Sequence, residues 1–98
     1  MSTPIPSPAA RAVARMPYIK VLRRRYVAAR TELDAARAAM EDYRKKRKAA
    51  WFANLPIPTN GDEVFDRFAR AERTYNARRF VYVRAWDDAM RSQVEMSA

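Results

Sequence analysis

Five consecutive cationic side chains form the densest chemical feature of the sequence, and two aromatic residues, Trp51 and Phe52, follow them after two alanines. Cations at this density attract phosphate groups, whether in lipid headgroups or in a nucleic acid. The aromatic rings would lie at headgroup depth in a bilayer, or would stack on exposed bases. A third interpretation needs no ligand: the cations form a solvated helix end, while Trp51 and Phe52 close a core. The cationic cluster comprises Arg44, Lys45, Lys46, Arg47 and Lys48.

Catalytic chemistry has few candidate residues in this chain. The sequence contains no Cys, no His and a single Gly, Gly61. Disulfides, thiolate nucleophiles and imidazole bases are therefore excluded, together with nearly all ligation of zinc, haem and iron–sulfur clusters. One Gly cannot form a phosphate-cradling loop. We expect a protein that is not an enzyme, with no cofactor, no metal and no small-molecule substrate.

The net charge of +9 lies in the first half of the chain. Residues 1–31 contain seven Lys or Arg and no acid, whereas residues 49–98 are neutral. This imbalance predicts an anionic partner for the first half. An acid-free segment rich in Arg, Ala, Ser and Thr is typical of mitochondrial targeting, although a tail that binds nucleic acid has the same composition. No apolar run is long enough to predict a span across a bilayer.

Proline and glycine set the expected helix boundaries. Residues 1–17 are predicted to form an extended, basic, Pro-rich N-terminal arm, in which a short helix fits at residues 9–15. Residues 18–54 lack both Pro and Gly and predict one helix, which Pro56 and Pro58 end. A turn at 55–59 leads to a second helix at 60–94, with Asn60 as its N-cap and Glu63 three residues later.

A short turn between two long helices predicts an all-α fold, an antiparallel helical hairpin over residues 18–98. The first helix has an apolar seam with alternating spacings of three and four residues, which predicts lengthwise packing against another helix. The second helix of the same chain or a helix of another chain would fit this seam equally well. The seam comprises Ile19, Leu22, Tyr26, Ala29, Leu33, Ala36, Met40 and Tyr43.

The second helix is apolar around more than half of its circumference near residues 80–86. Phe80–Val83 favours a strand locally, but the helix-forming residues on both sides override that preference. Two helices cannot bury all of this apolar surface, so partner proteins are expected to cover part of it. The expected partner-interface residues are Arg23, Arg24, Arg25, Tyr75, Arg78, Phe80, Tyr82, Arg84 and Trp86.

Residues 75–93 place Tyr75, Arg78, Phe80, an Arg84-Ala pair and a Met90-Arg pair at fixed intervals. This pattern resembles a helix of the ubiquinol–cytochrome c reductase binding-protein family, the subunit 7 type of respiratory complex III. The similarity covers about a fifth of the chain. It implies a non-catalytic subunit packed on the matrix side of cytochrome b.

We therefore expect a structural accessory subunit of a mitochondrial inner-membrane respiratory complex, bound peripherally on the matrix side. Complex III is the preferred complex. Its partners would be other subunits of the complex, and the cationic cluster with Trp51 and Phe52 would contact acidic protein or an anionic lipid such as cardiolipin. The alternative is a mitochondrial ribosomal protein that binds RNA through its basic half. A helical bacterial or phage protein that binds DNA is a third hypothesis.

Overall fold

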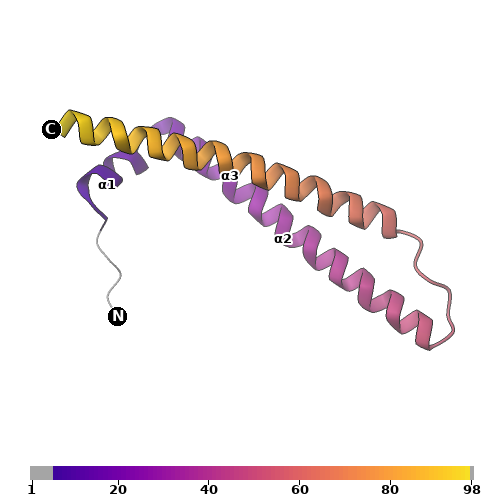
Figure 1. The fold of residues 1–98 in the computed structure, drawn as a ribbon. Coiled ribbons are helices and arrows are strands. Elements are labelled where there is room, and N and C mark those ends of the chain that lie inside the picture. The colour runs from indigo at the N-terminus through magenta and orange to yellow at the C-terminus, as the bar shows by residue number, and fades with distance from the viewer. Residues whose placement is uncertain (1–5, 98) are drawn as a thin grey trace, which may run out of the picture. The chain divides into compact units, whose positions relative to one another are not determined.

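A computed structural model describes residues 6–97, which form three helices: α1 (Pro8–Ala14), α2 (Pro17–Phe52) and α3 (Gly61–Ser97) (Figure 1). The predicted all-α fold with two long antiparallel helices is confirmed, and Phe80–Val83 is helical. Contacts divide the chain into two compact units, unit 1 (Met1–Val27 and Ala77–Ala98) and unit 2 (Ala28–Asn76). Both long helices contribute a segment to each unit. The part of the predicted arm at residues 1–5 lies outside the described residues.

The N-terminal arm is not extended throughout, because residues 8–14 form α1. Ser7 has an extended backbone, and its Oγ accepts a hydrogen bond from the Ala10 N–H at 3.1 Å. Pro8 then occupies the first helical turn, where a missing N–H leaves no hydrogen bond unmade. An N-cap serine followed by a proline at the first helical position favours the start of a helix. The short helix predicted near residues 9–15 is therefore present, and it corrects the prediction of an extended arm over 1–17.

In unit 1 the start of the predicted seam packs on the chain's own α3. Val13 of α1 and Ile19 of α2 are fully buried, and Ala89 of α3 lies with them in one cluster. Further along, the ring of Tyr26 stacks on Tyr82, with centroids 5.5 Å apart and planes 12° from parallel. The short helix α1 is thus fixed by one valine side chain in the core of unit 1.

In unit 2 the seam is filled in the same way. Leu33 and Ala36 of α2 are buried against Ala71 of α3, with Phe68 and Tyr75 packed around them. Met40 and Tyr43, further along the seam, are buried too. The partner helix that the heptad spacing required is therefore the second helix of the same chain.

α2 ends at Phe52, two residues before the predicted end, because the chain forms a Schellman motif there. Asn54 has a φ of 58°, in the left-handed region. The Leu55 N–H donates to the Ala50 C=O with an N···O distance of 2.9 Å, and the Asn54 N–H donates to the Trp51 C=O at 3.3 Å. These are the two hydrogen bonds that define the motif. The helix thus stops at its own cap before the first proline.

The start of α3 lies directly against the side chain of Tyr43. The Tyr43 hydroxyl donates a hydrogen bond to the Pro58 C=O at 3.3 Å, and its ring meets Phe65 edge-on at a centroid distance of 5.9 Å. A Cβ at Gly61 would lie 2.5 Å from the Tyr43 hydroxyl oxygen. The single glycine of the chain is therefore needed for the close approach of a buried ring. Asn60 precedes the helix as predicted, and its C=O accepts from the Val64 N–H.

The Schellman motif gives a first prediction. Asn54→Ala should destabilise the protein by about 1 kcal/mol, because a Cβ-bearing residue other than Asn or Asp is strained in the left-handed region. Asn54→Gly should leave the stability unchanged or raise it slightly, because glycine adopts this conformation freely. Urea denaturation followed by circular dichroism measures both. Equal stability of the alanine and glycine variants would show that the motif does not hold the end of α2.

Candidate interaction surface

The aromatic residues that follow the cationic cluster are exposed, not buried. Trp51 is 72% exposed and Phe52 is 77% exposed. The interpretation in which they close a core is therefore wrong. The physical reason is helical register: seven residues beyond Tyr43 the seam reaches Ala50, which is buried, and the next two side chains point away from it.

Two further apolar side chains from the turn are exposed close by in sequence: Leu55 at 62% and Ile57 at 43%. Neither residue was predicted to belong to this surface. The sequence does indicate their exposure: Leu55 and Ile57 flank Pro56 in a short turn, outside the helical seam. We call the surface formed by the cluster and these four side chains the turn surface. It comprises Arg44, Lys45, Lys46, Arg47, Lys48, Trp51, Phe52, Leu55 and Ile57.

A shallow groove of about 300 Å³ runs through the turn surface, lined by Arg44, Arg47, Lys48, Trp51 and Ile57. Cationic and apolar side chains thus border the same hollow. Such a lining suits a ligand that carries anionic groups beside apolar ones.

The five cations of the turn surface differ in their surroundings. Lys46 pairs with Asp42 one helical turn earlier, with an N···O distance of 3.0 Å. Arg44 lies over the ring of Phe65 at 5.7 Å from the centroid, a cation–π contact. Within residues 6–97, no ion pair engages Lys45, Arg47 or Lys48. These three charges are available to an external anion.

The predicted partner-interface residues separate into two groups. Tyr75 packs against the core of unit 2, while Tyr82 and Trp86 pack against the core of unit 1 and are half-buried. Their rings mainly hold the chain's own helices together. The exposed members are Arg23, Arg24, Arg25, Arg78, Phe80 and Arg84.

A second groove lies in unit 1, with a volume of about 540 Å³. Lys20, Arg23 and Arg24 of α2 line it together with Tyr82 and Trp86 of α3. Unit 1 holds ten Lys or Arg against three Asp or Glu, and unit 2 holds ten against eight. The fold therefore concentrates the positive charge in unit 1, a result that the charge count along the sequence did not predict.

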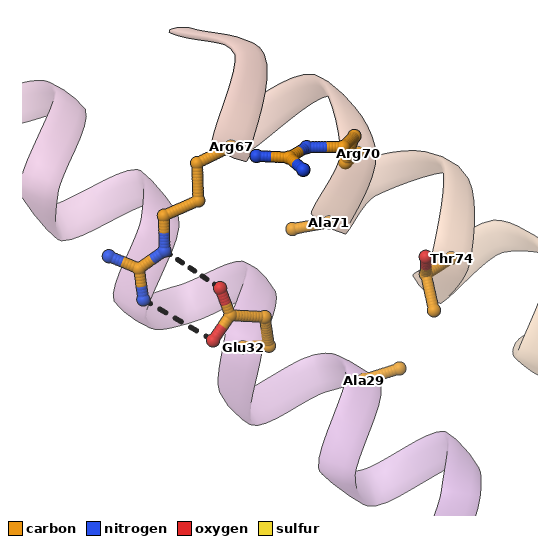
Figure 2. Close-up of a pocket in the computed structure, with 6 residues that line it drawn as sticks. All are labelled: Ala29, Glu32, Arg67, Arg70, Ala71 and Thr74. Atoms are coloured by element: carbon orange, nitrogen blue, oxygen red, sulfur yellow. Dashed lines mark hydrogen bonds and ion pairs between the residues drawn. The ribbon is translucent and has the colours of Figure 1, made fainter. Parts of the chain in front are cut away.

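Glu32 and Arg67 form the one ion pair between α2 and α3 that is resolved in the described residues (Figure 2). The Arg67 Nε donates to Glu32 Oε1 at 2.8 Å, and Nη2 donates to Oε2 at 3.3 Å. These hydrogen bonds from Arg67 lower the pKa of the Glu32 carboxyl below its ordinary value of 4.5. The carboxylate therefore stays ionised at neutral pH, as a bidentate pair requires.

Small side chains lie near the Glu32–Arg67 ion pair. Figure 2 shows Ala29 of α2 with Ala71 and Thr74 of α3 next to the Glu32–Arg67 contact, around a hollow of about 430 Å³. Ala29 and Ala71 are both buried. The ion pair lies at the edge of a close helix–helix contact.

The second prediction concerns pH. Because the folded-state pKa of Glu32 is lowered, its stabilising contribution is present above the unfolded pKa and is lost as the pH falls through the folded pKa. Glu32→Gln should lower the melting temperature slightly at about pH 7, and this difference should disappear as the pH falls below the lowered folded pKa. The effect should also shrink in high salt, because the pair is exposed. A difference that persists unchanged at low pH would contradict this assignment.

Residues 6–97 contain no group of three or more acidic side chains placed to hold a metal ion. Among the same residues, no helix combines the length and the apolar character needed to cross a membrane.

Comparison of the chain with protein-family models, with curated proteins and with solved structures finds no match. The resemblance of residues 75–93 to the subunit 7 family therefore stays a prediction.

Proposed function

We propose that this chain is a non-catalytic accessory subunit of a larger assembly. One observation carries the proposal: among the described residues, more large apolar side chains are exposed than buried. Twelve such side chains are exposed, whereas the buried core has five residues larger than alanine. Several of these side chains are close together in the sequence, at the turn and on α3, and grouped exposed apolar side chains are typical of an interaction surface. The buried five are Val13, Ile19, Leu33, Met40 and Tyr43.

The exposed apolar side chains of α3 in unit 1 support a protein partner. Phe80 is 63% exposed, and Val83 lies one turn further along the same side of the helix. Val94 is exposed three turns beyond Val83, but the exposed Asp87 and Arg91 lie between them on this side, so the apolar pair is Phe80 and Val83. A partner helix or groove could cover Phe80 and Val83, with the exposed Arg84 at their margin pairing with an acidic group.

The resemblance of residues 75–93 directs the choice of assembly to respiratory complex III, on the matrix side of the mitochondrial inner membrane. The residues that carry the resemblance include Phe80, Arg78 and Arg84, which are among the exposed side chains of unit 1. A cationic, acid-free first segment is also consistent with import into mitochondria.

A mitochondrial ribosomal protein is the second candidate. The groove of unit 1 favours it, because Lys20, Arg23 and Arg24 could bind backbone phosphates beside the rings of Tyr82 and Trp86. The concentration of positive charge in unit 1 is the electrostatic pattern expected for RNA binding.

The third prediction tests the proposed function. In the cells that make the protein, the tagged full chain should co-migrate with complex III on native gels of gently solubilised membranes. Phe80→Gln combined with Val83→Gln should weaken this association at least about tenfold, because two exposed apolar anchors are lost. Circular dichroism should show unchanged helix content.

Glu72→Gln, an exposed change on the same helix in unit 2, is the matched control and should co-migrate normally. Sedimentation of the protein with a particle that ribonuclease releases would replace the respiratory proposal with the ribosomal one. Migration of the native chain as a free monomer would contradict both.

A further inference from the structure

We infer that the turn surface inserts into an anionic lipid bilayer, with its apolar side chains entering the headgroup region and its cations binding lipid phosphates. The inference deepens the proposed function and rests on it for its setting at a membrane. Its physical basis is independent of which assembly the chain joins.

The apolar side chains of the turn surface are the first argument. Trp51, Phe52, Leu55 and Ile57 are exposed within seven residues of chain. Tryptophan and phenylalanine occupy the membrane–water interface readily, and aliphatic side chains extend into the acyl boundary below it. The Schellman motif at Asn54 separates the helical pair from the turn pair and fixes both locally.

Charge is the second argument. Residues 43–61 contain five cations and no acid, and Lys45, Arg47 and Lys48 have no ion-pair partner within the described chain. The nearest acids in sequence are Asp42, which is paired with Lys46, and Asp62 at the start of α3. Arg47 and Lys48 line the same groove as Trp51 and Ile57, so a ligand there meets charge and apolar surface together.

A lipid surface fits these observations better than a nucleic acid does. Phosphates and stacked bases would account for the cations and the aromatic rings. They leave Leu55 and Ile57 without a role, since aliphatic side chains offer no ring for a base to stack on. An anionic bilayer provides a partner for all four apolar side chains and for the cations at once.

The experiment uses the full chain carrying Trp86→Phe, which leaves Trp51 as the sole tryptophan. Vesicles of phosphatidylcholine with phosphatidylglycerol should shift the Trp51 emission to the blue, and lipids brominated on the acyl chain should quench it. Vesicles of phosphatidylcholine alone should bind far more weakly, because each cation near an anionic leaflet contributes about fivefold in affinity. Co-sedimentation with the vesicles gives the affinity.

Two variants locate the contact. Phe52→Ser with Leu55→Ser should reduce vesicle affinity at least about tenfold while Trp51 still reports. Tyr18→Ser removes an exposed aromatic from unit 1 that lies outside the proposed interfaces, and it should leave vesicle affinity unchanged. Circular dichroism confirms that each variant keeps its helices.

The inference is overturned if Phe52→Ser with Leu55→Ser binds vesicles as tightly as the parent, or if neutral and anionic vesicles bind equally. It is also overturned if a single-stranded RNA shifts the Trp51 emission while vesicles do not. Loss of complex association by the Phe80 and Val83 variant with vesicle binding intact would separate the two proposals. Failure of one therefore does not decide the other.

Discussion

The contact between α2 and α3 contains many small side chains, and this limits how much apolar surface the chain can bury. Of the ten buried apolar residues, five are alanines, which supply little apolar area. In unit 2, Ala29 of α2 and Ala71 of α3 lie between the two helices (Figure 2), and Ala36 is buried in one cluster with Ala71. A contact with so many small residues has room for only a few large side chains, such as Ile19 and Leu33. Most other large apolar side chains are half-buried or remain in solvent.

Aromatic contacts supplement this small core. Two aromatic members of the seam contact rings of α3: Tyr26 stacks on Tyr82 in unit 1, and Tyr43 meets Phe65 edge-on in unit 2. Tyr43 also reaches the turn, where it approaches Gly61 closely and donates to the Pro58 carbonyl. These contacts fix the register of the two helices within each unit. They do not cover Phe80, Trp51 or their apolar neighbours. The proposals on function therefore rest on this exposed surface.

Much of the fold could be predicted from the sequence, because periodicity and breakers act locally. The seam from Ile19 to Tyr43 has the spacing of helix packing, and every member is buried or half-buried. The end of α2 was predicted less well: Pro56 is a strong breaker, but Asn54 adopts the left-handed conformation first. A helix-stopping asparagine has only a weak sequence signal, since most asparagines lie elsewhere.

The candidate surfaces could be predicted only in part. The cationic cluster consists of consecutive residues and can be recognised directly from the sequence. Whether Trp51 and Phe52 face the core depends instead on the position of Ala50 in the seam. The gathering of positive charge in unit 1 depends on which segment of α3 lies beside residues 17–27, which is a property of tertiary structure. Val13 is similar, because nothing in the sequence of α1 indicates that this valine becomes fully buried.

We propose that the chain buries too little of its own apolar surface to be stable alone, and that its exposed side chains belong to an interface. Equilibrium urea unfolding of the purified full chain, followed by circular dichroism across a wide range of protein concentrations, distinguishes this from a self-sufficient monomer. We expect a shallow transition of low midpoint, with a midpoint that rises as the protein concentration rises. A sharp, cooperative transition of a monomer, with a midpoint independent of concentration, would contradict it.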